Sequence, residues 1–192
     1  LDNQILEITE TLDKDEGVRP ETTKEILSQL DPAFKPDGVI TAGNSSQISD
    51  GAAALLVVSE DVINKYNLEP IVKINSMSVV GTDPVLMLSG PIPATNKALE
   101  HAKLKPKDIN LVEVNEAFSS VVGAWRKEFP EIDYENVNAN GGSIAIGHPL
   151  GATGARLMTN LIHEMKRNKL KYGLQAICEG GGTANATIVE LV

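Results

Sequence analysis

A chain of 192 residues is long enough to form one domain with its own hydrophobic core. Its 42% hydrophobic and 22% charged residues are typical of a folded globular protein and exclude an intrinsically disordered one. The net charge of -9 at pH 7 repels a phosphate backbone, so we expect no nucleic-acid partner. The single cysteine, Cys178, excludes an internal disulfide, and three histidines without ligand spacing predict no metal site.

The sequence carries no sign of a membrane segment. No apolar stretch approaches the ~20 residues that a membrane-spanning helix requires. The first ten residues, LDNQILEITE, lack the basic start and apolar middle of a signal peptide. We therefore expect a protein of the cytoplasm, or of an organelle matrix, without a membrane span.

The N-terminal part of the chain has the composition of an arm rather than of a core. Residues 1–36 are polar and acidic, with one short amphipathic stretch at 22–30. An apolar run at 54–58 then precedes a polar helical stretch at 60–67 and a run with strand-like alternation at 71–77. This order predicts a β-α-β unit. We expect the arm, with the end of a lid or loop region, to cover residues 1–36 and the domain proper to cover the rest, to residue 192.

The remaining sequence continues the alternation of helices and strands. Two helices are predicted, at 95–103 and 119–129, with a strand at 111–114 between them. Apolar residues at helical spacing predict another helix over 157–165, which we expect Gly173 to close. Two strand-like runs joined by the turn EGGGTAN are predicted to lie antiparallel, at 174–178 and 187–192. The sum is a three-layer α/β domain with a mixed five-stranded sheet and helices on both faces.

Three loops deliver chemically active side chains to the ends of predicted strands, where α/β sheets form their sites. The first is NEAF, residues 115–118, directly after an apolar strand. The second is the glycine-rich NGGSIAIGHPLGATGAR, residues 140–156, which contains His148. The third begins at Cys178, which ends a strand and precedes Gly180, Gly181 and Gly182. We expect the three loops to converge on one point.

His148 and Cys178 are the candidates for acid and base chemistry. Pro149 disfavours helical geometry at His148 and so aims the imidazole, which is the only acid or base between residues 136 and 155. The glycines after Cys178 can direct backbone N–H groups at an oxyanion, and His148 is the neighbour that would favour the thiolate. The alternatives are a structural glycine turn and a cysteine that serves as a small buried hydrophobe.

The NEAF residues also have two interpretations. Asn115 can bind a water or a carbonyl group, and Phe118 can wall a pocket. Glu116 is explained equally well as a cap of the helix that follows. Other glycine motifs are not matched: no P-loop and no serine-hydrolase elbow occur, and GGGTAN lacks the third glycine of a dinucleotide fold.

Together these motifs resemble the thiolases, which make or cleave 3-ketoacyl-CoA. The matching segments follow the family order and span nearly the whole chain. They are DEGVRP from Asp15, TAGNSSQISDGAAAL from Thr41, SGPIPATNKAL from Ser89, NEAF from Asn115, NANGGSIAIGHPLGATGAR from Asn138 and CEGGG from Cys178. The His-Pro glycine motif combined with the terminal Cys-x-Gly-Gly-Gly is specific to this family.

The resemblance implies a Claisen condensation of an acyl-CoA with acetyl-CoA, or the reverse CoA-dependent thiolysis, through an acyl-cysteine. It implies that His148 activates the nucleophilic cysteine and stabilises an oxyanion with a water held by Asn115. It also implies that Cys178 moves the α-proton or protonates the leaving thiolate, and that the Gly180 N–H lines a second oxyanion hole. The residues implied in binding the CoA substrates are Ser46, Ala117, Phe118 and Arg19. No tightly bound cofactor is expected, and the intact enzyme is expected to be a homodimer or tetramer.

One departure from the family pattern limits what the chain does alone. The nucleophilic cysteine of the family lies in an N-terminal half-domain, and the only cysteine here, Cys178, aligns with the acid/base. We therefore expect this chain to be the C-terminal half, unable to form the acyl-enzyme without an N-terminal half. A second departure is Glu179, which would raise the pKa of Cys178 if its side chain pointed inward.

Two other functions remain open from the sequence. A noncatalytic acyl-CoA-binding or scaffold module would keep the fold and pair with a partner half. A related Claisen or decarboxylating enzyme would replace the terminal cysteine motif by histidine or asparagine, and CEGGG argues against it.

Overall fold

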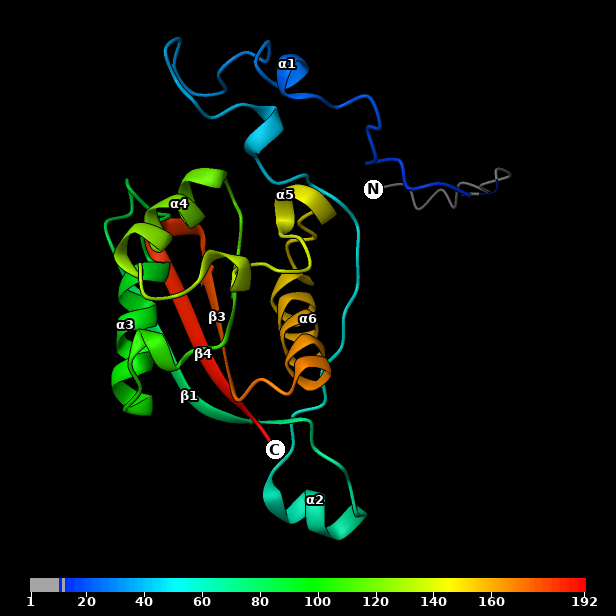
Figure 1. The fold of residues 1–192 in the computed structure, drawn as a ribbon, viewed down its shortest axis with the longest axis vertical. Coiled ribbons are helices and arrows are strands. Elements are labelled where there is room, and N and C mark those ends of the chain that lie inside the picture. The colour runs from blue at the N-terminus through cyan, green and yellow to red at the C-terminus, as the bar shows by residue number, and fades with distance from the viewer. Residues whose placement is uncertain (1–10, 12) are drawn as a thin grey trace, which may run out of the picture.

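The computed structural model describes residue 11 and residues 13–192 (Figure 1). The first ten residues of the predicted arm lie outside this range. The helices of the described part are α1 (Lys24–Leu27), α2 (Glu60–Tyr66), α3 (Pro91–Ala102), α4 (Ser119–Glu128), α5 (Ser143–Ile146) and α6 (Thr153–Asn168). Short 3-10 turns occupy Ala42–Asn44, Pro106–Asp108, Tyr134–Asn136 and Gly180–Gly182. The strands are β1 (Val72–Gly81), β2 (Leu111–Val114), β3 (Tyr172–Cys178) and β4 (Thr183–Leu191).

The strands form one mixed sheet in the order β1-β4-β3-β2. β4 pairs antiparallel with both β1 and β3, whereas β2 and β3 run parallel. Helices cover both faces: α3 packs on β1, β4 and β3, and α6 packs on β3, β2 and β4. Figure 1 shows the sheet between α3 and α6. The predicted three-layer α/β class is therefore confirmed.

The sheet of the described part has four strands instead of the predicted five. The apolar run at 54–58 lies in an extended segment, drawn in cyan, that leads past α6 to α2 and forms no strand (Figure 1). Leu56 and Val57 of this run are solvent-exposed, at 80% and 72%. The run has the residues of a buried strand, but no neighbouring strand of the described chain pairs with it.

Two apolar clusters hold the helices on the sheet. Under α3 and α4 the largest buried side chain is Trp125, whose ring Nε1 donates to Thr95 Oγ1 at 2.9 Å. Two buried serines of β1, Ser76 and Ser78, donate to backbone carbonyls of α3 and so satisfy their hydroxyl groups within this layer. On the other face, α6 packs its apolar stripe on the sheet through Leu161, Ile162 and Met165.

Several predicted element ends differ from the structure for local reasons. α3 begins at Pro91, four residues earlier than predicted, because proline suits the first turn of a helix. α6 begins at Thr153 and ends where Lys169 adopts a left-handed conformation with φ 54, so Gly173 does not close it. Gly173 lies in β3, where a Cβ atom would meet Met165 and Leu161 of α6. Its role is the close approach of helix and sheet.

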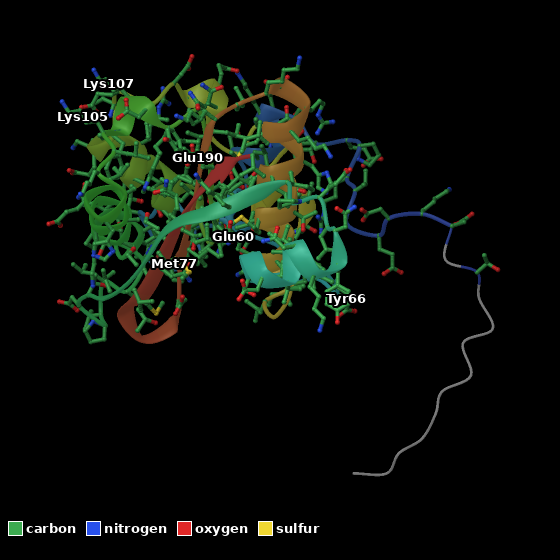
Figure 2. All side chains as sticks on the ribbon, turned by 90° about the horizontal axis from the view of Figure 1, so that it is seen from below. Glu60, Tyr66, Met77, Lys105, Lys107 and Glu190 are labelled. Atoms are coloured by element: carbon green, nitrogen blue, oxygen red, sulfur yellow. The ribbon has the colours of Figure 1, made fainter. Side chains whose placement is uncertain are left out.

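The outer surface carries polar groups where the strands meet solvent. Glu190 of β4, labelled in Figure 2, accepts from Lys73 Nζ at 3.0 Å and lies 3.8 Å from Lys171 Nζ. α2, which carries the labelled Glu60 and Tyr66, lies outside the layers near the start of β1 (Figures 1 and 2). Among the described residues, no helix is long and apolar enough to cross a membrane.

Candidate active site

The parallel pairing of β2 and β3 brings two of the three loops to the same edge of the sheet. Val114 is paired with Ala176, and the Asn115 N–H donates to the Ala176 carbonyl at 3.0 Å. Asn115 therefore lies beside the end of β3, where Cys178 is the last residue. Both side chains are buried, Asn115 at 1% and Cys178 at 8% exposure. The sequence-predicted NEAF and cysteine loops meet at this edge.

The glycine loop is tied to the NEAF loop through Glu116. Glu116 Oε2 accepts from the Ile144 N–H in the first turn of α5, and its Oε1 accepts from Asn138 Nδ2, each at 3.0 Å. The suggested cap of α4 is therefore wrong, because this carboxylate binds α5 instead. A Cβ on Gly142 would collide with the Glu116 carboxylate, so a glycine is required for this approach.

A second link runs through the buried hydroxyl of Ser143. Ser143 Oγ donates to Asn115 Oδ1 at 2.8 Å and accepts from Arg156 Nη2 at 3.2 Å. The same Nη2 donates to the Gly147 carbonyl at 3.2 Å, directly before His148. The chain of contacts thus runs from Asn115 to the residue that precedes the histidine.

The His148 ring is held in one tautomer by Thr153. Thr153 Oγ1 donates its only proton to the Pro149 carbonyl at 2.9 Å, so it accepts from His148 Nδ1–H at 2.7 Å. Nε2 of the neutral ring then carries a lone pair. Burial lowers the pKa of His148 from 6.5, and the positive charge of Arg156 lowers it further. The ring is therefore a neutral base at neutral pH.

The Cys178 thiol is held in its protonated form. Burial raises its pKa above 9.0, whereas the Asn115 side chain acts in the opposite direction and lowers it. Glu179 is exposed and accepts from Thr183 Oγ1 at 3.1 Å and Asn185 Nδ2 at 2.5 Å. Although its side chain does not point inward, its charge still adds to the rise of the Cys178 pKa.

The glycine turn after Cys178 shapes the backbone beside the thiol. Gly181 and Gly182 have φ of 78 and 85, a left-handed conformation that favours glycine. Gly180 is exposed and has open space where a Cβ would lie. No hydrogen bond within the described chain joins the His148 ring to Cys178, so the predicted meeting of imidazole and thiol stays a prediction.

Of the four residues proposed to bind substrate, three lie together. The Ser46 N–H donates to the Ala117 carbonyl at 3.1 Å, and the neighbouring Ser45 forms an isolated bridge with Phe118. Phe34 packs edge-on against the Phe118 ring, with centroids 5.3 Å apart. Arg19 is exposed and donates to the Gly17 carbonyl at 3.2 Å, outside this group.

The sequence does not predict the residues that hydrogen-bond to the candidate site residues and hold them in place. No sequence pattern indicates the roles of Thr153, Ser143 and Arg156, although all three lie in the glycine-rich segment 140–156. Glu113 carries the one signal that was available: a carboxylate inside the apolar run LVEV, at 1% exposure in the structure. Burial raises the pKa of Glu113 to about 8, against the opposing charge of Arg156.

A shallow hollow of about 540 Å³ lies beside the site, but neither His148 nor Cys178 lines it. Its walls include Glu116, Arg126, Tyr134 and Gly142. Within the described residues, no group of three or more metal-ligating side chains is suited to hold a metal ion.

The fold is an α/β domain in which the NEAF loop contacts both the glycine loop and the end of β3 at one edge of the sheet. Residues 68–191 match the family described as thiolase, C-terminal domain, and residues 3–61 match thiolase, N-terminal domain. The chain therefore belongs to the thiolase family. The two matches meet between residues 61 and 68, and the predicted boundary between residues 36 and 37 stays a prediction.

Several characterised proteins are similar to this chain over almost all of its length. It is 48% identical to 3-ketoacyl-CoA thiolase of Bacillus subtilis (strain 168), over 99% of this chain and 48% of that protein. The structure of Bacillus anthracis acetyl-CoA acetyltransferase matches with a TM-score of 0.88 and 44% identity, over 93% of this chain and 45% of that one. The human mitochondrial 3-ketoacyl-CoA thiolase in complex with CoA matches with a TM-score of 0.83 and 41% identity, over 93% and 45%. The chain spans about half the length of these relatives.

Proposed function

We propose that this chain supplies the acid and base half of a thiolase, which condenses an acyl-CoA with acetyl-CoA or cleaves a 3-ketoacyl-CoA with CoA. The observation that carries the proposal is that Asn115 contacts both other motif regions: its Oδ1 accepts from Ser143 Oγ of the glycine loop, and its N–H donates to the Ala176 carbonyl near the end of β3, where Cys178 lies. A merely structural glycine turn needs no such connection to a buried asparagine. The reacting cysteine that forms the acyl-enzyme is assigned to an N-terminal half.

In this proposal His148 is the base for the nucleophilic cysteine. The Nδ1–H contact with Thr153 leaves Nε2 free to take the thiol proton, which converts the nucleophile into a thiolate. The lowered pKa of His148 keeps this lone pair available at neutral pH. The thiolate then attacks the keto carbon, and the imidazolium and a water held by Asn115 stabilise the oxyanion.

Cys178 handles the proton on carbon. When the bond between C2 and C3 of the 3-ketoacyl-CoA breaks, the electron pair remains on C2 and the Cys178 thiol donates its proton there. In the synthetic direction the thiolate removes the same proton from acetyl-CoA. The raised pKa of Cys178 supports the acid role, because the protonated thiol predominates at neutral pH. The Gly180 N–H is proposed to stabilise the thioester oxyanion that accompanies this carbanion.

The CoA substrates are proposed to enter over the segment of Ser45 and Ser46, which contacts the NEAF loop. Ser46 contacts Ala117, and Ser45 contacts Phe118, through backbone groups beside the site. Arg19 is proposed to meet the adenine end, where a guanidinium suits a nucleotide. The similarity to a human thiolase solved in complex with CoA supports this class of ligand. No tightly bound cofactor is required by the proposed steps.

The partner of this chain is proposed to be an N-terminal thiolase half. The exposed run that contains Leu55, Leu56 and Val57 presents apolar side chains and, within the described chain, an unpaired backbone. Met77 of β1, labelled in Figure 2, and Val79 are also exposed on the sheet. Such surfaces mark an interaction site, since water contact with large apolar side chains is unfavourable. The complete enzyme is proposed to be a homodimer or tetramer in the cytoplasm or an organelle matrix.

The test is thiolysis of acetoacetyl-CoA by the intact enzyme, this chain together with the half that supplies the second cysteine. Loss of the acid or base is expected to slow turnover by about 100-fold or more in His148→Ala and Cys178→Ala. His163→Ala changes an exposed histidine of α6 and is the matched control with an unchanged rate. Wild-type rates in both site variants would contradict the proposal. CoA binding without any thiolysis by the wild type would favour the noncatalytic module.

A further inference from the structure

One nitrogen of Arg156 contacts both ends of α5 within the glycine loop. Nη2 lies 3.2 Å from Ser143 Oγ and 3.2 Å from the Gly147 carbonyl oxygen. We propose that Arg156 is a positioning residue: it holds the Ser143 hydroxyl that anchors Asn115 and the carbonyl that precedes His148, and so fixes these two groups relative to each other. The inference rests on the proposed thiolase function for its effect on turnover.

The direction of the hydrogen bonds gives Arg156 control over the Asn115 amide. A guanidinium only donates, so Ser143 Oγ accepts from it and directs its own proton at Asn115 Oδ1. The amide oxygen of Asn115 is therefore held by a hydrogen bond from Ser143. The Asn115 side chain also acts on the thiol, where it lowers the pKa of Cys178 against the larger effect of burial. Two hydrogen bonds, from Arg156 to Ser143 and from Ser143 to Asn115, therefore link Arg156 to the side chain that acts on Cys178.

The cost of burying Arg156 argues that its charge and donors are needed. Nε and Nη1 are buried without a hydrogen-bond partner among the described residues, and Glu113 Oε2 is in the same condition. Burial lowers the pKa of Arg156, and the charges of Glu113 and Glu116 oppose this. An apolar side chain would fill the space with less desolvation. What an apolar residue lacks is a donor for the two acceptors at the ends of α5.

Arg156 also faces the titrating groups of the site from α6. They come from three further segments: Glu113 from β2, Glu116 from the loop that follows β2, and His148 from the loop before α6. The guanidinium repels a proton on His148 and so favours the neutral base. A packing role alone would not give this dependence on charge.

The first experiment is an NMR titration of the His148 ring in the intact protein. Arg156→Gln removes the charge and is expected to raise the pKa of His148. Arg156→Lys keeps a charge and one donating nitrogen, and is expected to leave the His148 pKa near that of the wild type. Arg167→Gln is the matched control, because it removes a charge from the exposed Arg167–Glu164 pair of the same helix. An equal His148 pKa in the Arg156→Gln and wild-type proteins would overturn the proposal.

The second experiment separates the Asn115 branch from the charge. Ser143→Ala keeps Arg156 but removes the hydroxyl that anchors Asn115. The pH profile of iodoacetamide alkylation, read from the mass of the peptide that carries Cys178, is expected to shift to higher pH in this variant. An unchanged alkylation profile would contradict the positioning of Asn115 through Ser143. Thr159→Ala, which removes a hydroxyl bonded only to its own helix, is the control and is expected to leave the profile unchanged.

Turnover provides the third readout. In the intact enzyme, a misplaced base lowers kcat by about 10- to 100-fold while KM changes little, and Arg156→Lys restores part of the loss seen in Arg156→Gln. A rise in KM with unchanged kcat in Arg156→Gln would overturn the positioning role. If the wild-type protein has no thiolase activity, the proposed function fails. The His148 titration and the Cys178 alkylation remain readable in that case and test the inference separately.

Discussion

Glu113 shows how a single carboxyl group behaves when it is enclosed by a sheet and a helix. The burial of its charge outweighs the attraction of Arg156, and the pKa of Glu113 rises to about 8. In the unfolded chain the same group has its ordinary pKa of 4.5. The folded state therefore retains the proton between pH 4.5 and 8, while the unfolded state loses it. Stability must fall as the pH rises through this window.

The prediction concerns Glu113→Gln, which replaces the acid with a neutral group of the same shape. Relative to this variant, the wild type is expected to lose about 1.4 kcal/mol of unfolding free energy per pH unit within the window. The accumulated difference at pH 8 is on the order of 4 kcal/mol. Urea unfolding at pH 5, 6.5 and 8 measures it. Glu131→Gln, a change of an exposed carboxylate, is the control, and parallel pH profiles of wild type and Glu113→Gln would contradict the account.

At this scale the sequence predicts the acting groups better than the supporting ones. Asn115 and Cys178 were expected at neighbouring strand ends because each directly ends an apolar run, and the parallel pairing of β2 and β3 brings their backbones together. Thr153 and Arg156 were not expected, because their roles depend on how the glycine loop folds back on the first turns of α6. Such contacts are set by tertiary structure and leave no periodic signal.

At the scale of elements, the turn between β3 and β4 holds the thiol in place. The Gly182 carbonyl accepts from the Thr82 N–H at 2.7 Å and from Thr82 Oγ1 at 2.9 Å. A Cβ on Gly182 would lie 2.7 Å from the Thr82 carbonyl oxygen and 3.0 Å from Pro84 Cα. These are backbone atoms, which cannot move aside cheaply. The turn is therefore locked to the segment that follows β1.

Two alanine substitutions within this turn are predicted to have different effects. Gly182→Ala combines a left-handed φ with backbone collisions and is expected to destabilise the fold by about 2–4 kcal/mol. Gly180→Ala meets no atom within 4 Å and is expected to leave stability within about 0.5 kcal/mol. Urea midpoints at one pH compare the two variants. Equal midpoints would contradict the locked turn.

The local sequence pattern predicts the order of most helices and strands, but it does not predict which strands pair in every case. The predicted strand at 111–114 coincides with β2, and the two final strands are antiparallel as expected. The run at 54–58 was predicted to join the sheet, because its apolar residues are those of a buried strand. A strand also needs a partner with unpaired N–H and C=O groups, and the pattern of one segment does not reveal where that partner lies.

In the molecule as a whole, the sheet packs its apolar clusters within the described chain, but several large apolar side chains remain exposed to solvent. The core under α3 and α4 and the cluster under α6 are buried, while the run at 54–58 and the β1 residues Met77 and Val79 remain exposed. The relatives are about twice as long as this chain. We propose that the exposed surface binds the N-terminal half and that this chain supplies the groups that move protons.

We propose that the Cys178 thiol moves the α-proton of the acyl-CoA substrate. The exchange of the acetyl methyl protons of acetyl-CoA with D2O, followed by NMR in the intact enzyme and in Cys178→Ala, measures this step. We expect exchange in the wild type and a loss of about 100-fold or more in the variant, since no other thiol of this chain can replace Cys178. Exchange at the wild-type rate in Cys178→Ala would contradict the claim.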